Sequence, residues 1–160
     1  MAVITAIPVA NTLLAELKLR GVSATPMKLQ RMLYLVSVGY ARETGQLLFS
    51  EPFACWQYGP VCPSVQAKFG CFKAHPVTKY GKDACGNALF LDLASSGPAL
   101  RHAVADVVAK CARADVRALS NVVRTDGSAW ERAFRSGSET LSDRDLRNDP
   151  CWDAMLAIPA

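Results

Sequence analysis

Hydrophobic residues recur at helical spacing near the N-terminus. They predict a first helix over about 8–20, whose apolar face consists of Val9, Leu13, Leu14 and Leu17. Gly21 follows directly, and glycine is the residue most often found just beyond the C-terminus of a helix. We therefore expect this helix to end before Gly21 and to bury one face.

A second and more apolar helix is predicted between Thr25 and Gly45. Thr25 and Pro26 form a typical helix start, because threonine caps the first free N–H groups and proline is tolerated at the first helical position. Its apolar positions are Leu29, Met32, Leu33, Val36 and Tyr40. This pattern places the helix in the core, with Lys28, Gln30 and Arg31 on its polar side.

The pattern changes after Gly45. Residues 46–58 are rich in aromatic and aliphatic side chains around Pro52, which favours an extended segment followed by a turn at Gly59-Pro60. A short helix is predicted over 65–69. Residues 70–86 are polar and indicate a loop or hairpin arm, and residues 88–93 indicate a short strand.

The remaining third of the chain again shows helical spacing. Helix starts are predicted at Pro98, Asp115, Ser128 and Ser142, and before a last apolar group whose side chains are expected to face inward: Trp152, Met155 and Leu156. The predicted fold is mainly α, a single compact helical domain over residues 1–160 with a minor β element of short strands or a hairpin.

Composition supports a folded chain of one domain. The 160 residues are 51% hydrophobic and 20% charged, which excludes intrinsic disorder. The longest apolar stretch, residues 33–41, is too short to cross a bilayer, and no basic segment precedes the apolar N-terminal residues as in a secretory signal. We therefore expect a cytoplasmic protein with no membrane partner and with free thiols.

Charge is divided unevenly along the chain. Residues 1–82 carry nine Lys or Arg against three Asp or Glu, whereas residues 83–160 carry nine against eleven. A basic N-terminal half is compatible with a nucleic-acid-binding surface, but an ordinary solvated surface is the favoured interpretation. No run of five like charges occurs, so nucleic-acid binding is the alternative function and not the main prediction.

Catalytic and metal-binding patterns are weak. The six cysteines form no C-x-x-C pair, and Cys71 with His75 is the only spacing that resembles a ligand pair. The chain has no phosphate-binding loop, no dinucleotide-binding glycine pattern and no H-E-x-x-H. We predict no enzymatic activity, no catalytic residues, no cofactor and no metal; a thiol- or metal-dependent enzyme built on Cys71 and His75 is a third hypothesis.

Aromatic and turn residues gather between Phe53 and Pro60. Tryptophan and tyrosine combine a large contact area with a polar tip, which suits both a core and a protein interface. Two alternatives follow for Trp56 and Tyr58: their rings pack the segment onto the second helix, or they contact a partner.

The run MKLQRMLYLVSVGYARETGQLLFSEPFACWQYGPVCPSVQAKF, residues 27–69, resembles the Panacea-domain family, the SocA-like antitoxins that include phage-associated proteins. The family shows a Lys-Leu-Gln helix start, a glycine near the helix end and a Trp-x-Tyr-Gly-Pro-Val turn. The matching positions here are Lys28, Leu29, Gln30, Leu33, Tyr34, Gly45, Glu51, Phe53, Trp56, Tyr58, Gly59, Pro60 and Val61.

The C-terminal half resembles the family more loosely. Leu119, Ser120, Thr125 and Trp130 correspond to a Leu-Ser, Thr-His and Trp element, but Asp126 stands where the family has histidine. That departure argues against a histidine-based activity in this chain.

The resemblance implies a small helical bacterial protein that works by protein–protein contact. Family members neutralise partner toxins in toxin–antitoxin systems, and one branch is a proteolytic adaptor that delivers its toxin to an ATP-dependent protease. The residues expected to contact the partner are Lys28, Tyr34, Trp56 and Tyr58. Those expected to support the fold are Leu29, Leu33, Gly45, Phe53, Gly59, Pro60, Val61 and Trp130.

Overall fold

The computed structural model describes residues 3–159. Helix α1, Ala6–Leu19, ends as the sequence predicts. Gly21 adopts a left-handed conformation (φ 70°), and its N–H donates to the Lys18 carbonyl at 3.0 Å while that of Val22 donates to the Leu17 carbonyl at 3.0 Å. This pair of bonds satisfies carbonyls that the helix end would leave free.

Helix α2, Pro26–Thr44, has both predicted boundaries. The Thr25 hydroxyl accepts the Lys28 N–H at 3.3 Å, and Gly45 ends the helix in a left-handed conformation (φ 74°). Its middle residues, including Leu29, Met32, Leu33 and Val36, have no exposed surface. The expectation that this helix lies in the core is confirmed.

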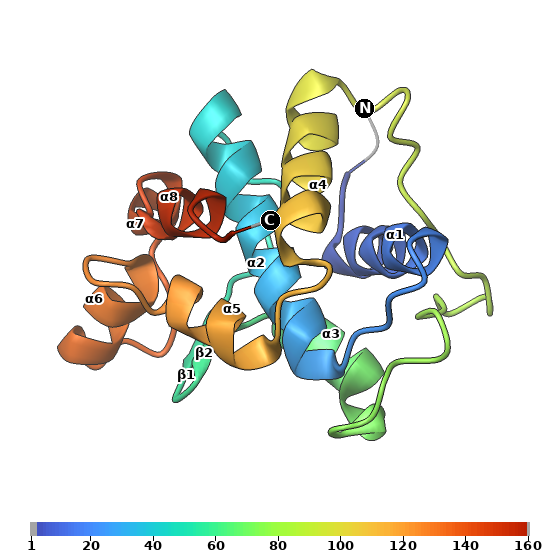
Figure 1. The fold of residues 1–160 in the computed structure, drawn as a ribbon, viewed down its shortest axis with the longest axis horizontal. Coiled ribbons are helices and arrows are strands. Elements are labelled where there is room, and N and C mark those ends of the chain that lie inside the picture. Colours follow the sequence, from blue (N-terminus) through green and yellow to red (C-terminus); the bar gives the residue numbers. More distant parts are fainter. Residues whose placement is uncertain (1–2, 160) are drawn as a thin grey trace.

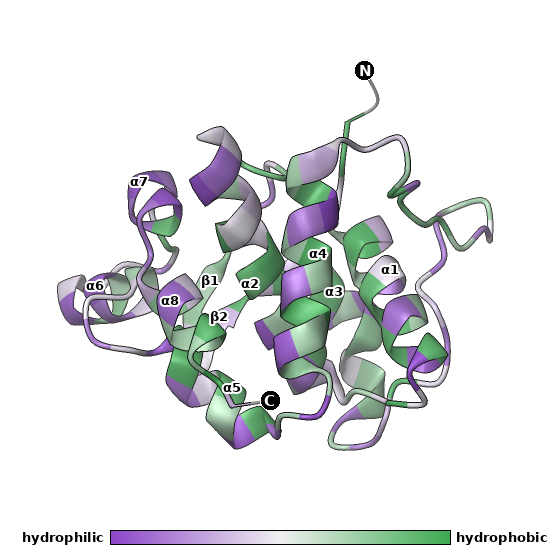
Figure 2. Cartoon of the chain, turned by 45° about the horizontal axis from the view of Figure 1, so that its top comes forward, coloured by the Kyte–Doolittle hydropathy of each residue, from purple (hydrophilic) through white to green (hydrophobic). Residues whose placement is uncertain are grey.

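The other long elements surround α2. Helix α4, Pro98–Cys111, runs beside it, α1 lies on one side, and α5, Val116–Val123, covers its N-terminal half (Figure 1). Hydrophobic residues predominate along α2, whereas the peripheral α7, Asp143–Arg147, is mostly hydrophilic (Figure 2). One cluster of buried residues extends from α1 to the C-terminal helices.

Two short strands form an antiparallel hairpin, β1 at Ala54–Trp56 and β2 at Gly59–Val61. Its two-residue turn is Gln57-Tyr58, so the predicted turn at Gly59-Pro60 was wrong, because these residues begin β2. Proline is tolerated there because β2 is an edge strand, so its missing N–H breaks no ladder bond. The other edge of β1 is covered by residues 139–141, which exchange two backbone bonds with Phe53 and Cys55.

The segment between the hairpin and α4 is largely irregular. It contains α3, Pro63–Phe69, and the short 3-10 helix η1, Gly70–Phe72. The predicted strand over 88–93 is absent from the described structure, which has only an isolated bridge between Lys82 and Ala88 there. The backbone of this segment bonds to side chains of α1 instead: Asn11 donates to the Leu89 carbonyl at 2.9 Å, and Thr12 accepts the Leu91 N–H at 2.9 Å.

The C-terminal helices begin at the predicted caps. Asp115, Ser128 and Ser142 accept N–H groups at the starts of α5, α6 (Ala129–Ser136) and α7. The last helix, α8, is Cys151–Leu156, and the Asp149 carboxylate accepts the Cys151 N–H at 2.9 Å. Leu156 is exposed, so the expectation that it faces inward was wrong. Its neighbour Met155 takes the buried side of α8.

The predicted fold class is confirmed: the protein is mainly α, with one small antiparallel sheet. Within residues 3–159, none of the helices combines the length and the hydrophobicity that crossing a bilayer demands.

Candidate partner-binding site

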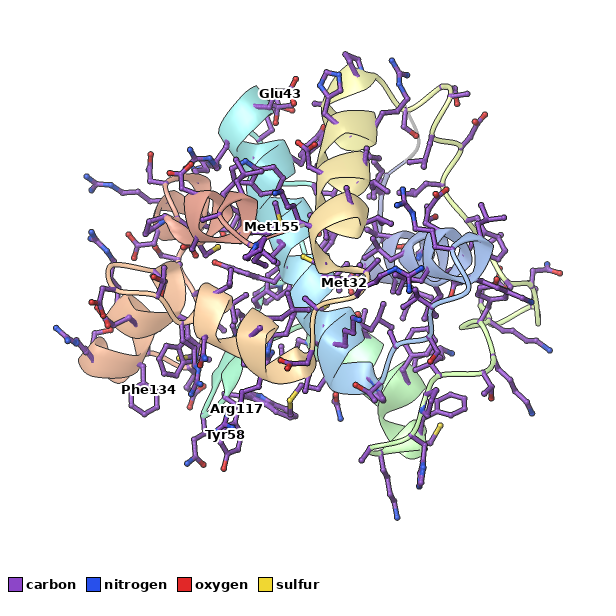
Figure 3. The ribbon with its side chains drawn as sticks, in the orientation of Figure 1. Met32, Glu43, Tyr58, Arg117, Phe134 and Met155 are labelled. Carbon is purple, nitrogen blue, oxygen red and sulfur yellow. The ribbon has the colours of Figure 1, made fainter. Side chains whose placement is uncertain are left out.

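The hairpin presents two aromatic side chains to solvent. Trp56 is 48% exposed and Tyr58 is 56% exposed, although both belong to the most aromatic stretch of the sequence. Tyr58 projects from the lower edge of the molecule in Figure 3. The alternative in which both rings pack onto the second helix is therefore wrong, and the rings are free to contact a partner.

Arg31 of α2 fixes the hairpin in this position. Its Nη1 donates to the Pro60 carbonyl at 2.8 Å, and its Nη2 donates to the Tyr58 carbonyl at 2.8 Å. Its Nε donates to the Ser120 hydroxyl of α5 at 3.3 Å. The side chain is only 1% exposed, which corrects the prediction that Arg31 lies on a solvated face of the helix.

Gly59 is required for this close approach. A Cβ at this position would lie 2.8 Å from the Arg31 Cζ, and the backbone φ of 137° also disfavours residues with a side chain. The family-like Tyr-Gly-Pro sequence therefore has a local physical reason. The hairpin can accept a buried guanidinium only where it has no side chain.

Gln30 anchors the end of the same hairpin. Its Nε2 donates to the Cys62 carbonyl at 3.0 Å, and its Oε1 accepts the Cys62 N–H at 2.8 Å. Both bonds are buried, so the side-chain amide acts as a short strand partner for the residue that leads into α3. The prediction that Gln30 lies on the polar side of the helix was wrong, because its side chain, like that of Arg31, bonds to the hairpin backbone inside the protein.

Lys28 and Tyr34 do not belong to an accessible surface. The Lys28 ammonium donates to the Ala112 carbonyl at 2.6 Å, just beyond the end of α4, and burial lowers its pKa. The Tyr34 hydroxyl has no exposed surface and donates to the Asp149 carboxylate, and burial raises its pKa well above the ordinary value. Both residues stabilise the interior, which corrects their assignment to partner contact.

Trp130 links the hairpin to α6. Its indole N–H donates to the Trp56 carbonyl at 2.6 Å, and its ring stacks on Phe134 with 4.8 Å between centroids. Phe134 is 54% exposed. We call the surface formed by Trp56, Tyr58, Trp130 and Phe134 the aromatic face. Phe134 was not among the predicted site residues, although it stands four residues after Trp130, a spacing that places two side chains on one face of a helix.

The remaining family-like positions support the fold. Leu29, Leu33 and Phe53 are core residues, and the Phe53 ring meets the edge of Tyr34 at 4.9 Å between centroids. Val61 is buried in β2, Gly45 ends α2, and the Pro60 carbonyl accepts Arg31. Glu51 accepts the Ala6 N–H at 2.8 Å and so caps α1.

A pocket of about 390 Å³ lies beside the aromatic face, between the start of α2, the hairpin and η1. Residues from all three elements line it: Met27, Arg31, Trp56, Tyr58, Val61 and Lys73. Burial and the neighbouring Arg124 lower the pKa of Arg31 to about 10, so this guanidinium remains charged at neutral pH.

Cys71 and His75 are both exposed, and no group of three His, Cys, Asp or Glu side chains in residues 3–159 is placed to hold a metal ion. Burial raises the pKa of Cys111 to about 12, so that thiol is protonated at neutral pH. Asp126 is exposed in the turn between α5 and α6.

No protein-family model, curated protein or solved structure matches the chain.

Proposed function

We propose that this protein is a cytoplasmic bacterial antitoxin or proteolytic adaptor that neutralises a partner toxin by direct contact through the aromatic face. The observation that carries the proposal is the exposure of Trp56 and Tyr58 on a hairpin held by buried bonds. The resemblance of residues 27–69 to Panacea domains, which are found in phage-associated antitoxins, supports the choice of a toxin as partner.

The physical basis of the proposal is the energy that aromatic residues contribute to interfaces. Tryptophan, tyrosine and arginine dominate binding hot spots, and they do so where the surface around them is rigid. Arg31 and Gln30 restrict the hairpin, and Trp130 bonds to its backbone, so little conformational entropy is lost when a partner binds. The site is an interaction surface on a preformed scaffold.

Nucleic-acid binding remains the alternative function. Two of the cations of the basic N-terminal half, Lys28 and Arg31, are buried and donate to backbone carbonyls inside the protein. This reduces the basic surface on which that alternative depends. A binding assay with duplex and single-stranded oligonucleotides at two salt concentrations tests it, because phosphate contacts weaken steeply as salt rises.

A growth assay tests the proposed function. The tagged protein captures its partner from lysate of the native host, and the partner is then expressed alone and with the antitoxin candidate. We expect the partner to arrest growth, the wild type to restore it, and Trp56→Ala with Tyr58→Ala to abolish the rescue. Phe90→Ala is the matched control, because Phe90 is an exposed aromatic residue outside the aromatic face.

Blocking and delivery to a protease give different results for the partner's lifetime. With an adaptor, the half-life of the partner shortens in cells that contain the ATP-dependent protease and is restored when the protease is deleted. With a blocking antitoxin, rescue persists in both strains. A partner that is harmless alone, or a rescue unaffected by the double variant, contradicts the proposal.

A further inference from the structure

The pocket beside the aromatic face has a marked charge imbalance. Arg31 and Lys73 line it, and no Asp or Glu of residues 3–159 does. The rest of the lining is apolar or uncharged, with Met27, Trp56 and Val61 forming much of the wall. A pocket of this composition is complementary to a ligand that carries both an apolar group and a negative charge.

Arg31 is a buried cation without a counter-ion. Its three hydrogen-bond partners are two carbonyls and a hydroxyl, and none of the ion pairs in the described chain involves it. A buried charge that is hydrogen-bonded but not neutralised leaves a positive field in the adjoining cavity. A second cation, Arg124, is close enough to lower the pKa of Arg31 and adds to this field.

Lys73 stands in an unusual backbone conformation at the rim of the same pocket. Its φ is 54° and its ψ is −119°, and it is the one residue other than glycine with positive φ among those described. A side chain in this region is strained, and strained residues gather at binding sites. Glycine would fit this position better, so a lysine here indicates a use for its ammonium group.

We propose that the pocket binds a short segment of the partner polypeptide in which an aromatic or other large apolar side chain stands next to an aspartate or glutamate. The inference rests on the proposed function and specifies the chemistry of the partner. The apolar side chain enters between Trp56 and Met27, and the carboxylate lies toward Lys73 within the field of Arg31.

The experiment selects peptides from a phage-displayed library of random sequences on the immobilised full-length protein. Phage that bind the Lys73→Glu variant are removed first. We expect the recovered sequences to share an acidic residue adjacent to an aromatic or large apolar one. The best peptide is then synthesised with its acid and, separately, with the corresponding amide, and both affinities are measured by titration.

The expected result is an affinity at least about tenfold weaker for the amide peptide, the effect of losing one charge-assisted hydrogen bond. The acidic peptide should also bind Lys73→Glu at least about tenfold more weakly than the wild type. Lys79→Glu is the control: Lys79 is an exposed lysine outside this pocket, and its reversal should leave the affinity unchanged. Both variants are surface changes whose folding is checked by circular dichroism.

Three results of the selection and titration overturn the inference. They are a selection that enriches no sequences, enriched sequences without an acid, or equal affinity for the acid and amide peptides. If a single-stranded oligonucleotide binds the pocket and the peptides do not, the inference is also overturned, because the pocket would then recognise phosphates. If the growth assay fails while the acidic peptide binds, the toxin proposal falls and the pocket inference stands. If Lys73→Glu still rescues growth, the pocket inference falls and the toxin proposal stands.

Discussion

Gly59→Ala is the most informative single change in the hairpin. The new Cβ would lie 2.8 Å from the Arg31 Cζ and 3.1 Å from its Nε and Nη1. The guanidinium cannot move aside freely, because it donates to Tyr58, Pro60 and Ser120. The substitution must therefore displace a bonded, buried group in addition to forcing an unfavourable φ.

The cost follows from these two effects. A side chain at positive φ costs roughly 1–2 kcal/mol, and a lost hydrogen bond from a charged donor costs about 1.5–3 kcal/mol. We expect Gly59→Ala to reduce the free energy of unfolding by about 2.5–5 kcal/mol, the sum of the two. Gly45→Ala is the matched control, because φ at Gly45 is 74° but nothing lies within 4 Å of the added Cβ; it should cost only the roughly 1–2 kcal/mol of conformational strain.

Urea titrations of the two variants measure the difference directly. Equal costs for Gly59→Ala and Gly45→Ala would refute the reasoning, because the contact with Arg31 would then contribute nothing. The second check is the double variant Gly59→Ala with Arg31→Met. Once the guanidinium is absent, the alanine should cost no more than strain alone, so the two changes should be strongly non-additive.

Three further predictions concern other parts of the molecule. In Gly39→Ala the added Cβ would lie 2.5 Å from the Trp152 Cζ3, so we expect a loss of about 1–3 kcal/mol in urea unfolding and a changed near-ultraviolet circular dichroism signal; an unchanged midpoint contradicts this. Lys73→Gly relieves the strained backbone, so we expect Tm to rise by about 2–4 °C while the acidic peptide binds less well. Burial raises the pKa of Asp149 above 3.8, so the folded protein binds the proton of this carboxyl group more tightly than the unfolded chain does. The stability advantage of the wild type over Asp149→Asn should therefore shrink as pH rises from 3.8 through that raised pKa. Urea titrations across this pH range measure it, and a stability advantage that grows with pH contradicts the prediction.

Local signals were sufficient to predict most helix boundaries. Thr25, Gly45, Asp115, Ser128 and Ser142 stand where the structure caps helices, because capping depends only on residues within one turn. The mainly helical fold with a minor β element followed from the same patterns.

The polar residues at the start of α2 were misplaced because their partners are distant in sequence. Lys28, Gln30 and Arg31 donate to backbone groups 84, 32 and 27–29 residues away. Periodicity assigns polar residues to water, and it cannot show which carbonyls need donors.

The aromatic face was predicted in part. Trp56 and Tyr58 were identified from their residue types and spacing, whereas Phe134 was not among the residues expected to contact a partner. Phe134 lies four residues after Trp130 in the same helix, so their stacking follows from helical spacing, whereas the bond from Trp130 to the hairpin backbone required the structure. The pocket required the structure, because α2, the hairpin and η1 contribute to it from separate parts of the chain.

The affinity of the purified protein for its captured toxin is the most direct measure of the proposed interaction. We predict that Trp56→Ala or Tyr58→Ala weakens binding about thirtyfold or more, corresponding to about 2 kcal/mol at a hot spot, and that Phe90→Ala leaves it unchanged. Wild-type affinity in both folded hairpin variants would contradict the assignment of the aromatic face as the binding surface.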